Sequence, residues 1–149
     1  MPELGAIRGL RKAWDRVTRP RHVKVIYLVI YALSSLIGVV TLLNPPQTIA
    51  GEVGPVLTNV WAGLFILGGF VGVVTVLPGW WWVERLLGIA PIMIGLAIYL
   101  SVVTVLHWQA LDTGGSRATQ IGIILLAASP FILRFFFIKE YSYEPRARG

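Results

Sequence analysis

Four long apolar segments alternate along the chain with short stretches that carry proline, glycine and polar residues. The apolar segments are residues 25–43, 59–77, 86–106 and 119–138. Each is close to the roughly 20 residues that a helix needs to cross about 30 Å of hydrocarbon. Because lipid offers no hydrogen-bond partners, each segment must satisfy its own backbone groups. The pattern therefore predicts an all-α integral membrane protein with four transmembrane helices.

The breaks between these segments have the residues of turns. They are Asn44-Pro45-Pro46, Pro78-Gly79 and the stretch from Asp112 to Ser116. The first break continues into a loop, residues 44–58, whose one charged residue is Glu52. That carboxylate is expected to cap the second helix, to contact a partner or simply to be solvated. Inside the segments, Pro91 and Pro130 predict kinks whose freed carbonyls need other donors.

The composition supports a membrane protein. Of 149 residues, 56% are hydrophobic and only 13% are charged, which is too little charge to cover a soluble domain of this length. The absence of cysteine excludes a disulfide framework, a thiolate metal site and a cysteine nucleophile.

The distribution of lysine and arginine predicts the orientation. Seven lie before or at the edge of the first segment, one lies between the second and third, and four lie at the end of the fourth segment or beyond it. Only Arg117 falls in the two other loops. The bias places both termini in the cytoplasm. A competing interpretation makes the first segment a signal peptide cleaved after Ala50, but the basic arm is too long and the apolar stretch exceeds a usual signal sequence.

Residues 1–24 predict a basic amphipathic helix on the cytoplasmic face. Ile7, Leu10, Trp14 and Val17 form one apolar stripe, and Pro20 ends the helix before the membrane. Such a helix lies among headgroups and contacts anionic lipid. The residues assigned to that contact are Arg8, Arg11, Lys12, Arg16, Arg19, Arg21 and Lys24. The arm is alternatively only an orientation signal. Nucleic acid is not expected as a partner, because lipid better explains basic residues beside a span. Residues 139–149 form a short cytoplasmic tail.

The predicted spans carry little chemistry. Arg134 is the only charged residue in them, and near the end of the fourth span it can reach the interface. Serine and threonine hydroxyls are expected to bond to their own backbone or to a neighbouring helix. His22 and His107 lie on opposite sides of the membrane and cannot share a metal. The chain is therefore predicted to be no enzyme and to hold no metal or cofactor.

Small residues predict close approach of helices. Gly68 and Gly72 have the GxxxG spacing, and Gly95, Ala97 and Ser101 follow in the third segment. Such residues let backbones approach, either in a homo-oligomer or within the four-helix bundle itself.

Six tryptophans lie near predicted boundaries of the spans, where an indole keeps its N–H hydrated and its ring in apolar surroundings. These predicted membrane-interface anchors are Trp14, Trp61, Trp80, Trp81, Trp82 and Trp108. Three of them are consecutive, so no single helix face can hold all three side chains. A turn at the membrane boundary can hold them, because it is surrounded by the lipid interface on several sides. A partner-binding surface is the alternative interpretation.

The turn motifs also resemble a known group. Asn44-Pro45-Pro46, Thr48-Ile49 and Gly51–Pro55, followed by Pro78–Trp82 and Glu84-Arg85, resemble four-span holin-like membrane proteins of actinobacteriophage lysis cassettes. The resemblance implies a bacteriophage protein of the bacterial inner membrane. Such a protein oligomerises to permeabilise or depolarise the membrane during lysis, together with a lysis partner protein.

A wide pore needs a wettable helix face, and none of the four segments offers a clear polar stripe. The alternative is a non-pore scaffold, an anchor, or a phage exclusion or immunity protein that binds another membrane or cytoplasmic partner. A small transporter subunit is a third possibility.

Overall fold

The computed structural model describes residues 21–45, 47–111 and 114–141, and these are helices joined by short turns. In chain order the elements are α2 (Arg21–Leu43), α3 (Gln47–Val76), α4 (Trp81–Val83), η1 (Glu84–Ile89), α5 (Ala90–Leu111) and α6 (Ala118–Tyr141). The π-helical turn η1 joins α4 directly to α5, so the three form one continuous helix. The predicted amphipathic arm, up to residue 20, and the tail after residue 141 lie outside the described residues.

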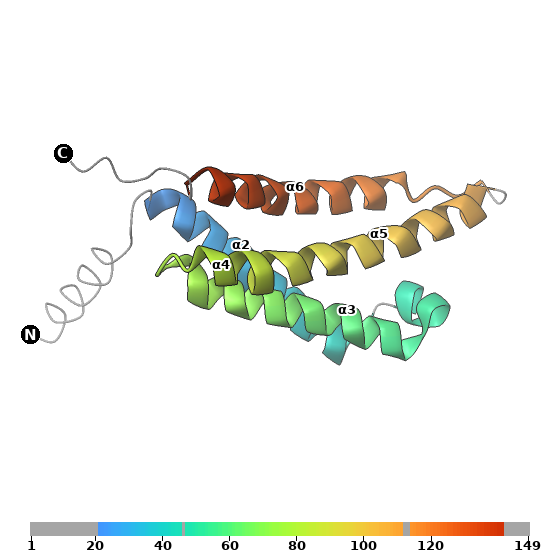
Figure 1. The fold of residues 1–149 in the computed structure, drawn as a ribbon. Coiled ribbons are helices and arrows are strands. Elements are labelled where there is room, and N and C mark those ends of the chain that lie inside the picture. The colour runs from blue at the N-terminus through green and yellow to red at the C-terminus, as the bar shows by residue number, and fades with distance from the viewer. Residues whose placement is uncertain (1–20, 46, 112–113, 142–149) are drawn as a thin grey trace, which may run out of the picture.

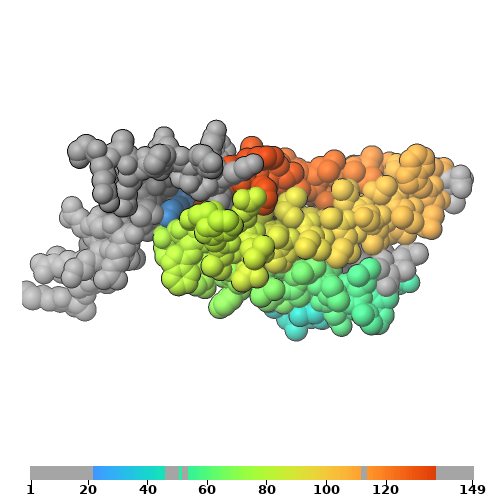
Figure 2. All heavy atoms as spheres, in the orientation of Figure 1, coloured from blue at the N-terminus to red at the C-terminus, as the bar shows by residue number. Residues whose placement is uncertain are grey.

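The described helices lie side by side as an elongated bundle (Figure 1), and in Figure 2 the atoms of α5 lie between those of α3 and those of α6. α3 packs against α2, η1 and α5, and α6 packs along α5 and η1. Four segments are long and apolar enough to cross a membrane: His22–Leu43, Gly54–Val76, Trp81–Leu111 and Ala118–Phe136. The expected all-helical, multi-pass architecture is confirmed at this level. The third segment begins at Trp81 and therefore includes Glu84 and Arg85, which the sequence interpretation had placed outside the span.

Each end of the bundle is defined by its turns. The start of α2, the turn between α3 and α4, and the end of α6 lie together at one end, here called the α3–α4 end (Figure 1). Pro78-Gly79 forms that turn as expected, and Gly79 has a φ of 79° that favours glycine. The opposite end holds the turn between α2 and α3 and the turn between α5 and α6 (Figure 1).

The loop predicted after the first span is largely helical. α3 begins at Gln47 and continues to Val76, with a break at Gly54, where φ is 81° and ψ is 163°. Pro55 follows, and the Thr58 hydroxyl donates to the carbonyl of Gly54 at 3.1 Å. This backbone conformation is essentially restricted to glycine. The Gly54-Pro55 pair thus sets the angle at which the second span leaves the loop.

Proline disturbs α6 without leaving a carbonyl unsatisfied. Pro130 has no N–H, so the carbonyl of Leu126 loses its helical partner. The Ser129 hydroxyl donates to this carbonyl at 2.7 Å. In the third span Pro91 lies two residues after the π-helical turn, and the N–H of Ala90, between them, reaches back to the carbonyl of Arg85. Both prolines were predicted to distort their helices, and a hydroxyl satisfies the carbonyl freed at Pro130.

Four further hydroxyls in the spans follow the expectation from sequence. Ser34, Thr75, Ser101 and Thr104 each donate to the carbonyl four residues earlier in the same helix. These bonds satisfy the hydroxyls locally. They leave the arrangement of the helices to packing and to the charged residues described next.

Candidate functional site

Glu84 is the most unusual side chain of the bundle. It lies in the first turn of η1 and is fully buried, at 0% exposure. A carboxylate taken out of water is costly unless charged and hydrogen-bonding partners surround it. The groups around Glu84 therefore define the candidate site.

Arg134 of α6 is the charged partner. Its Nε lies 2.8 Å from Oε1 of Glu84, and its Nη2 lies 3.0 Å from Oε2. This two-point geometry uses both oxygens and is the strong form of an arginine–carboxylate pair. The sequence interpretation expected Arg134 to reach for the interface. Instead its side chain is only 14% exposed and turns into the bundle.

Tyr31 of α2 supplies the third contact. Its hydroxyl donates to Oε1 of Glu84 at 2.9 Å, and the residue is fully buried. The ring fits against Gly72 of α3, where a Cβ would collide with ring atoms, and lies 5.9 Å from the ring of Phe131. The glycine thus makes room for the tyrosine that reaches Glu84.

Tyr27 and Lys24, one and two turns earlier in α2, extend the site. The Tyr27 hydroxyl donates to the carbonyl of Pro130 at 2.9 Å, and the Arg134 guanidinium lies 4.8 Å from the Tyr27 ring centre. The Lys24 ammonium donates to the carbonyl of Leu77, at the end of α3, at 3.1 Å. We call these five residues the Glu84 cluster: Lys24, Tyr27, Tyr31, Glu84 and Arg134.

Lys24 was predicted to contact anionic lipid, and its position corrects that assignment. The side chain is 7% exposed and bonds within the protein. A cation at a helix C-terminus stabilises the carbonyls that have no helical partner there. The Arg21 side chain and the other five residues assigned to lipid contact, Arg8, Arg11, Lys12, Arg16 and Arg19, lie outside the described part.

The Glu84 cluster joins the spans through polar contacts. Glu84 lies in the third span, its partners come from the first and fourth, and Leu77 follows the second. Both oxygens of the carboxylate accept bonds from within the chain. Such an arrangement holds helices in one register, and its polar atoms face the interior of the bundle.

Sequence reasoning missed the Glu84 cluster because it placed Glu84 among headgroups. One signal was available. An arginine within a membrane span needs a partner, and two carboxylates on the same side of the membrane, Glu84 and Glu140, each lay two residues from a predicted span. The hydroxyls of Tyr27 and Tyr31 were further donors in the first predicted span.

The predicted packing residues divide into two groups. A Cβ at Gly68 would lie 2.6 Å from the carbonyl oxygen of Gly88, and one at Gly95 would lie 2.6 Å from the Phe65 ring. Together with Gly72 against Tyr31, these glycines allow close contacts within the chain. Ala97 and Ser101 are exposed on α5.

The predicted interface tryptophans also divide. Trp80, Trp82 and Trp108 are exposed and Trp81 is half-buried, whereas Trp14 lies outside the described residues. Trp61 is different, because it is 7% exposed and packs against the rings of Phe65 and Tyr99 at 5.5 and 5.1 Å. Its indole belongs to the core of the bundle and does not face lipid.

Within the described residues, no group of three or more His, Asp or Glu side chains comes together. No family model matches the chain, and no curated protein or solved structure matches it either.

Proposed function

We propose that the chain is a multi-pass membrane anchor or scaffold that works as a closed four-helix bundle and does not form a pore. It lies in the bacterial inner membrane with both termini in the cytoplasm, as the distribution of basic residues predicts. The observation that carries this proposal is the Glu84 cluster, whose carboxylate is satisfied entirely by groups of the same chain.

The exterior of the bundle supports the same proposal. Large apolar side chains are exposed along all four spans, and examples from successive spans are Leu36, Phe70, Ile94 and Leu126. Lipid solvates such surfaces, whereas a water-filled pore needs polar ones. A ring of bundles in this conformation would enclose an apolar lumen.

The turn at the α3–α4 end is the proposed contact with a cytoplasmic partner. Trp80 and Trp82 are 60% and 66% exposed, and the Trp82 ring contacts the Trp81 ring at a centroid distance of 4.3 Å and a tilt of 33°. Exposed, rigid aromatic side chains are typical anchors of protein interfaces, and they also suit the headgroup layer. Both roles place this turn at the membrane boundary.

The proposal is tested by regulated expression in a bacterial host with a membrane-potential dye. A non-pore protein leaves the membrane potential and growth unchanged at high levels in the membrane. Abrupt, timed depolarisation in the wild type would reject the proposal.

A holin-like function is the second candidate, and one observation favours it. α6 contributes Arg134 to the Glu84 cluster, so displacement of α6 would uncover Glu84, Lys24 and Tyr31 together. These residues would give the polar face that the closed bundle lacks. A lysis protein that oligomerises in this open state would reconcile the holin-like resemblance with the apolar exterior.

The double variant Glu84→Gln, Arg134→Gln separates the two functions. If displacement of α6 makes a pore, the double variant should depolarise the membrane earlier than the wild type does at the same protein level. If the bundle is an anchor, the variant lowers the amount of folded protein and leaves the potential unchanged. Arg117→Gln, at the opposite end of the bundle, is the matched control.

A further inference from the structure

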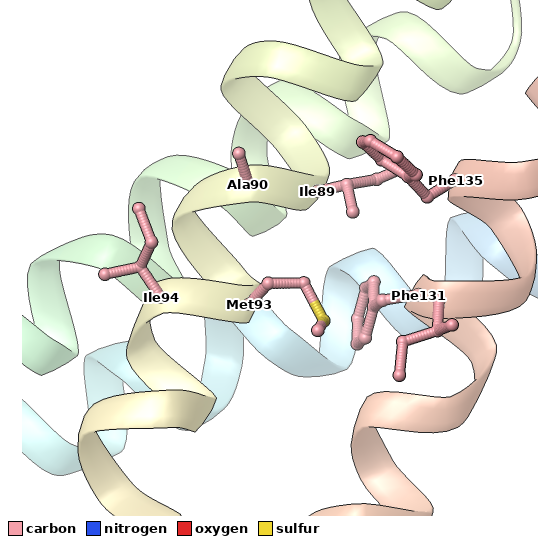
Figure 3. Close-up of a pocket in the computed structure, with 7 residues that line it drawn as sticks. Ile89, Ala90, Met93, Ile94, Phe131 and Phe135 are labelled. Carbon is pink, nitrogen blue, oxygen red and sulfur yellow. The ribbon is translucent and has the colours of Figure 1, made fainter. Parts of the chain in front are cut away.

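An apolar groove lies between the third span and α6. Its volume is about 330 Å³, and its lining includes Ile89, Met93, Phe131, Ile132 and Phe135. Figure 3 shows Met93 and Phe131 facing each other across the gap between the two helices. The volume lies at the lower end of the range of about 300–1,000 Å³ for small-molecule sites. All the lining side chains are apolar, so the groove takes a hydrocarbon group.

A cation lies beside this groove. The guanidinium carbon of Arg85 is 3.9 Å from the ring centre of Phe135, which itself lines the groove. Within the described part of the chain Arg85 makes no ion pair with a carboxylate. Its charge is thus available to an anion, whereas the charge of Arg134 is used by Glu84.

The depth of these groups matches a lipid. Arg85 lies four residues after Trp81, where the helix of the third span begins, so it is about 6 Å along the helix from that end. The groove continues inward to Ile94, about 13 Å beyond Arg85. A cation near the membrane boundary matches the anionic headgroup of a phospholipid, and an apolar groove that extends inward from it matches an acyl chain.

We propose that this groove binds an anionic glycerophospholipid of the bilayer, with its phosphate group at Arg85 and an acyl chain between α5 and α6. Charge complementarity favours this occupant over a second copy of the chain. The four described spans of a second copy contain one carboxylate, Glu84, which is buried and already paired with Arg134, so a span packed into the groove offers Arg85 no free counter-charge. The site is distinct from the basic arm before residue 21, and it requires both the cation and the groove.

The test is lipid titration of the purified full chain in a neutral detergent, with bound lipid counted by native mass spectrometry. Phosphatidylglycerol is compared with phosphatidylcholine of the same acyl chains, and with glycerol phosphate as a headgroup without chains. The first phosphatidylglycerol adduct is expected at about fivefold lower concentration than the first phosphatidylcholine adduct, the effect of about one basic residue near a surface. Glycerol phosphate is expected not to compete.

Variants assign the adduct to the groove. Arg85→Gln removes the preference for phosphatidylglycerol and leaves phosphatidylcholine binding unchanged. Met93→Trp fills the gap and weakens both adducts, and Ile94→Trp at the exposed rim repeats this test should Met93→Trp fold poorly. Arg117→Gln at the other end and Leu36→Trp on α2 are matched controls that retain wild-type binding.

Three results would overturn the proposal. The first is equal binding of phosphatidylglycerol and phosphatidylcholine by the wild type. The second is an Arg85→Gln variant that still prefers phosphatidylglycerol, because the lipid would then lie at other basic residues. Alternatively, Ile132→Cys would crosslink two copies across the groove in a reaction that phosphatidylglycerol does not suppress, and the occupant would then be a second chain.

Discussion

Arg134 holds both oxygens of the Glu84 carboxylate, at 2.8 and 3.0 Å, across 50 residues of sequence. The pair ties α6 to the beginning of the third span. Of the four spans, the fourth is the least covered by the rest of the protein, with 17% of it buried, against 28–44% for the others. Apolar packing therefore contributes less to the position of α6 than to the positions of the other spans. We expect the ion pair with Glu84 to be the main contact that fixes α6.

Breaking the pair should destabilise the bundle. Glu84→Gln leaves Arg134 without its counter-charge, and removal of one partner of a buried pair costs about 3–5 kcal/mol. Thermal or denaturant unfolding in detergent measures the loss. The double variant Glu84→Gln, Arg134→Gln should lose less than the two single changes added together, because it leaves no unpaired charge. Additive losses would show that the two side chains do not interact.

Gly72 should tolerate no side chain. In Gly72→Ala the new Cβ meets the buried Tyr31 ring, and such overpacking costs about 1–3 kcal/mol. Gly63→Ala is the matched control in the same helix, because a Cβ there has no neighbour within 4 Å. The control should be neutral or more stable by up to about 1 kcal/mol, since alanine favours helix. Equal stability of the two variants would contradict the packing described here.

Substitution of Gly54 should destabilise the protein because of the backbone conformation at this residue. Its φ of 81° and ψ of 163° are strained for any other residue, so Gly54→Ala should cost about 1–3 kcal/mol in unfolding free energy. Gly51→Ala, in the same loop with a φ outside the positive range, should be nearly neutral. A Gly54→Ala variant as stable as Gly51→Ala would mean that the kink is not needed.

The absence of cysteine allows a direct measurement of orientation. Single cysteines at the exposed positions Asn44, Pro78 and Ser116 are introduced one at a time. With both termini in the cytoplasm, a membrane-impermeant maleimide should label positions 44 and 116 in intact cells. Position 78 should react only after the membrane is opened. The reverse pattern would invert the proposed topology.

Self-association is expected through the exposed face of α5 that carries Ala97 and Ser101. A single cysteine at position 97 should give crosslinked dimers in membranes, and Ser101→Ile in that background should reduce them severalfold. Gly68→Ile is expected to lower stability, since Gly68 faces the backbone at Gly88. A dimer yield unaffected by Ser101→Ile would exclude this face.

Hydrophobicity along the chain predicted the four spanning helices, but not the residues at which the second and third helices begin. Uninterrupted apolar runs of about 20 residues leave the backbone no other way to satisfy itself in lipid. The turn at Pro78-Gly79 was also readable from the sequence, because proline fixes φ and glycine permits the positive φ found at Gly79.

Tertiary structure decided which polar residues became partners. Glu84 is 53 residues from Tyr31 and 50 from Arg134, and hydrophobic periodicity contains no information about such separations. Lys24 and Trp61 are residue types that are common at membrane interfaces, yet helix packing buries both side chains. A side chain's depth depends on its position along one helix, whereas its exposure depends on the neighbouring helices, and only the assembled bundle specifies those.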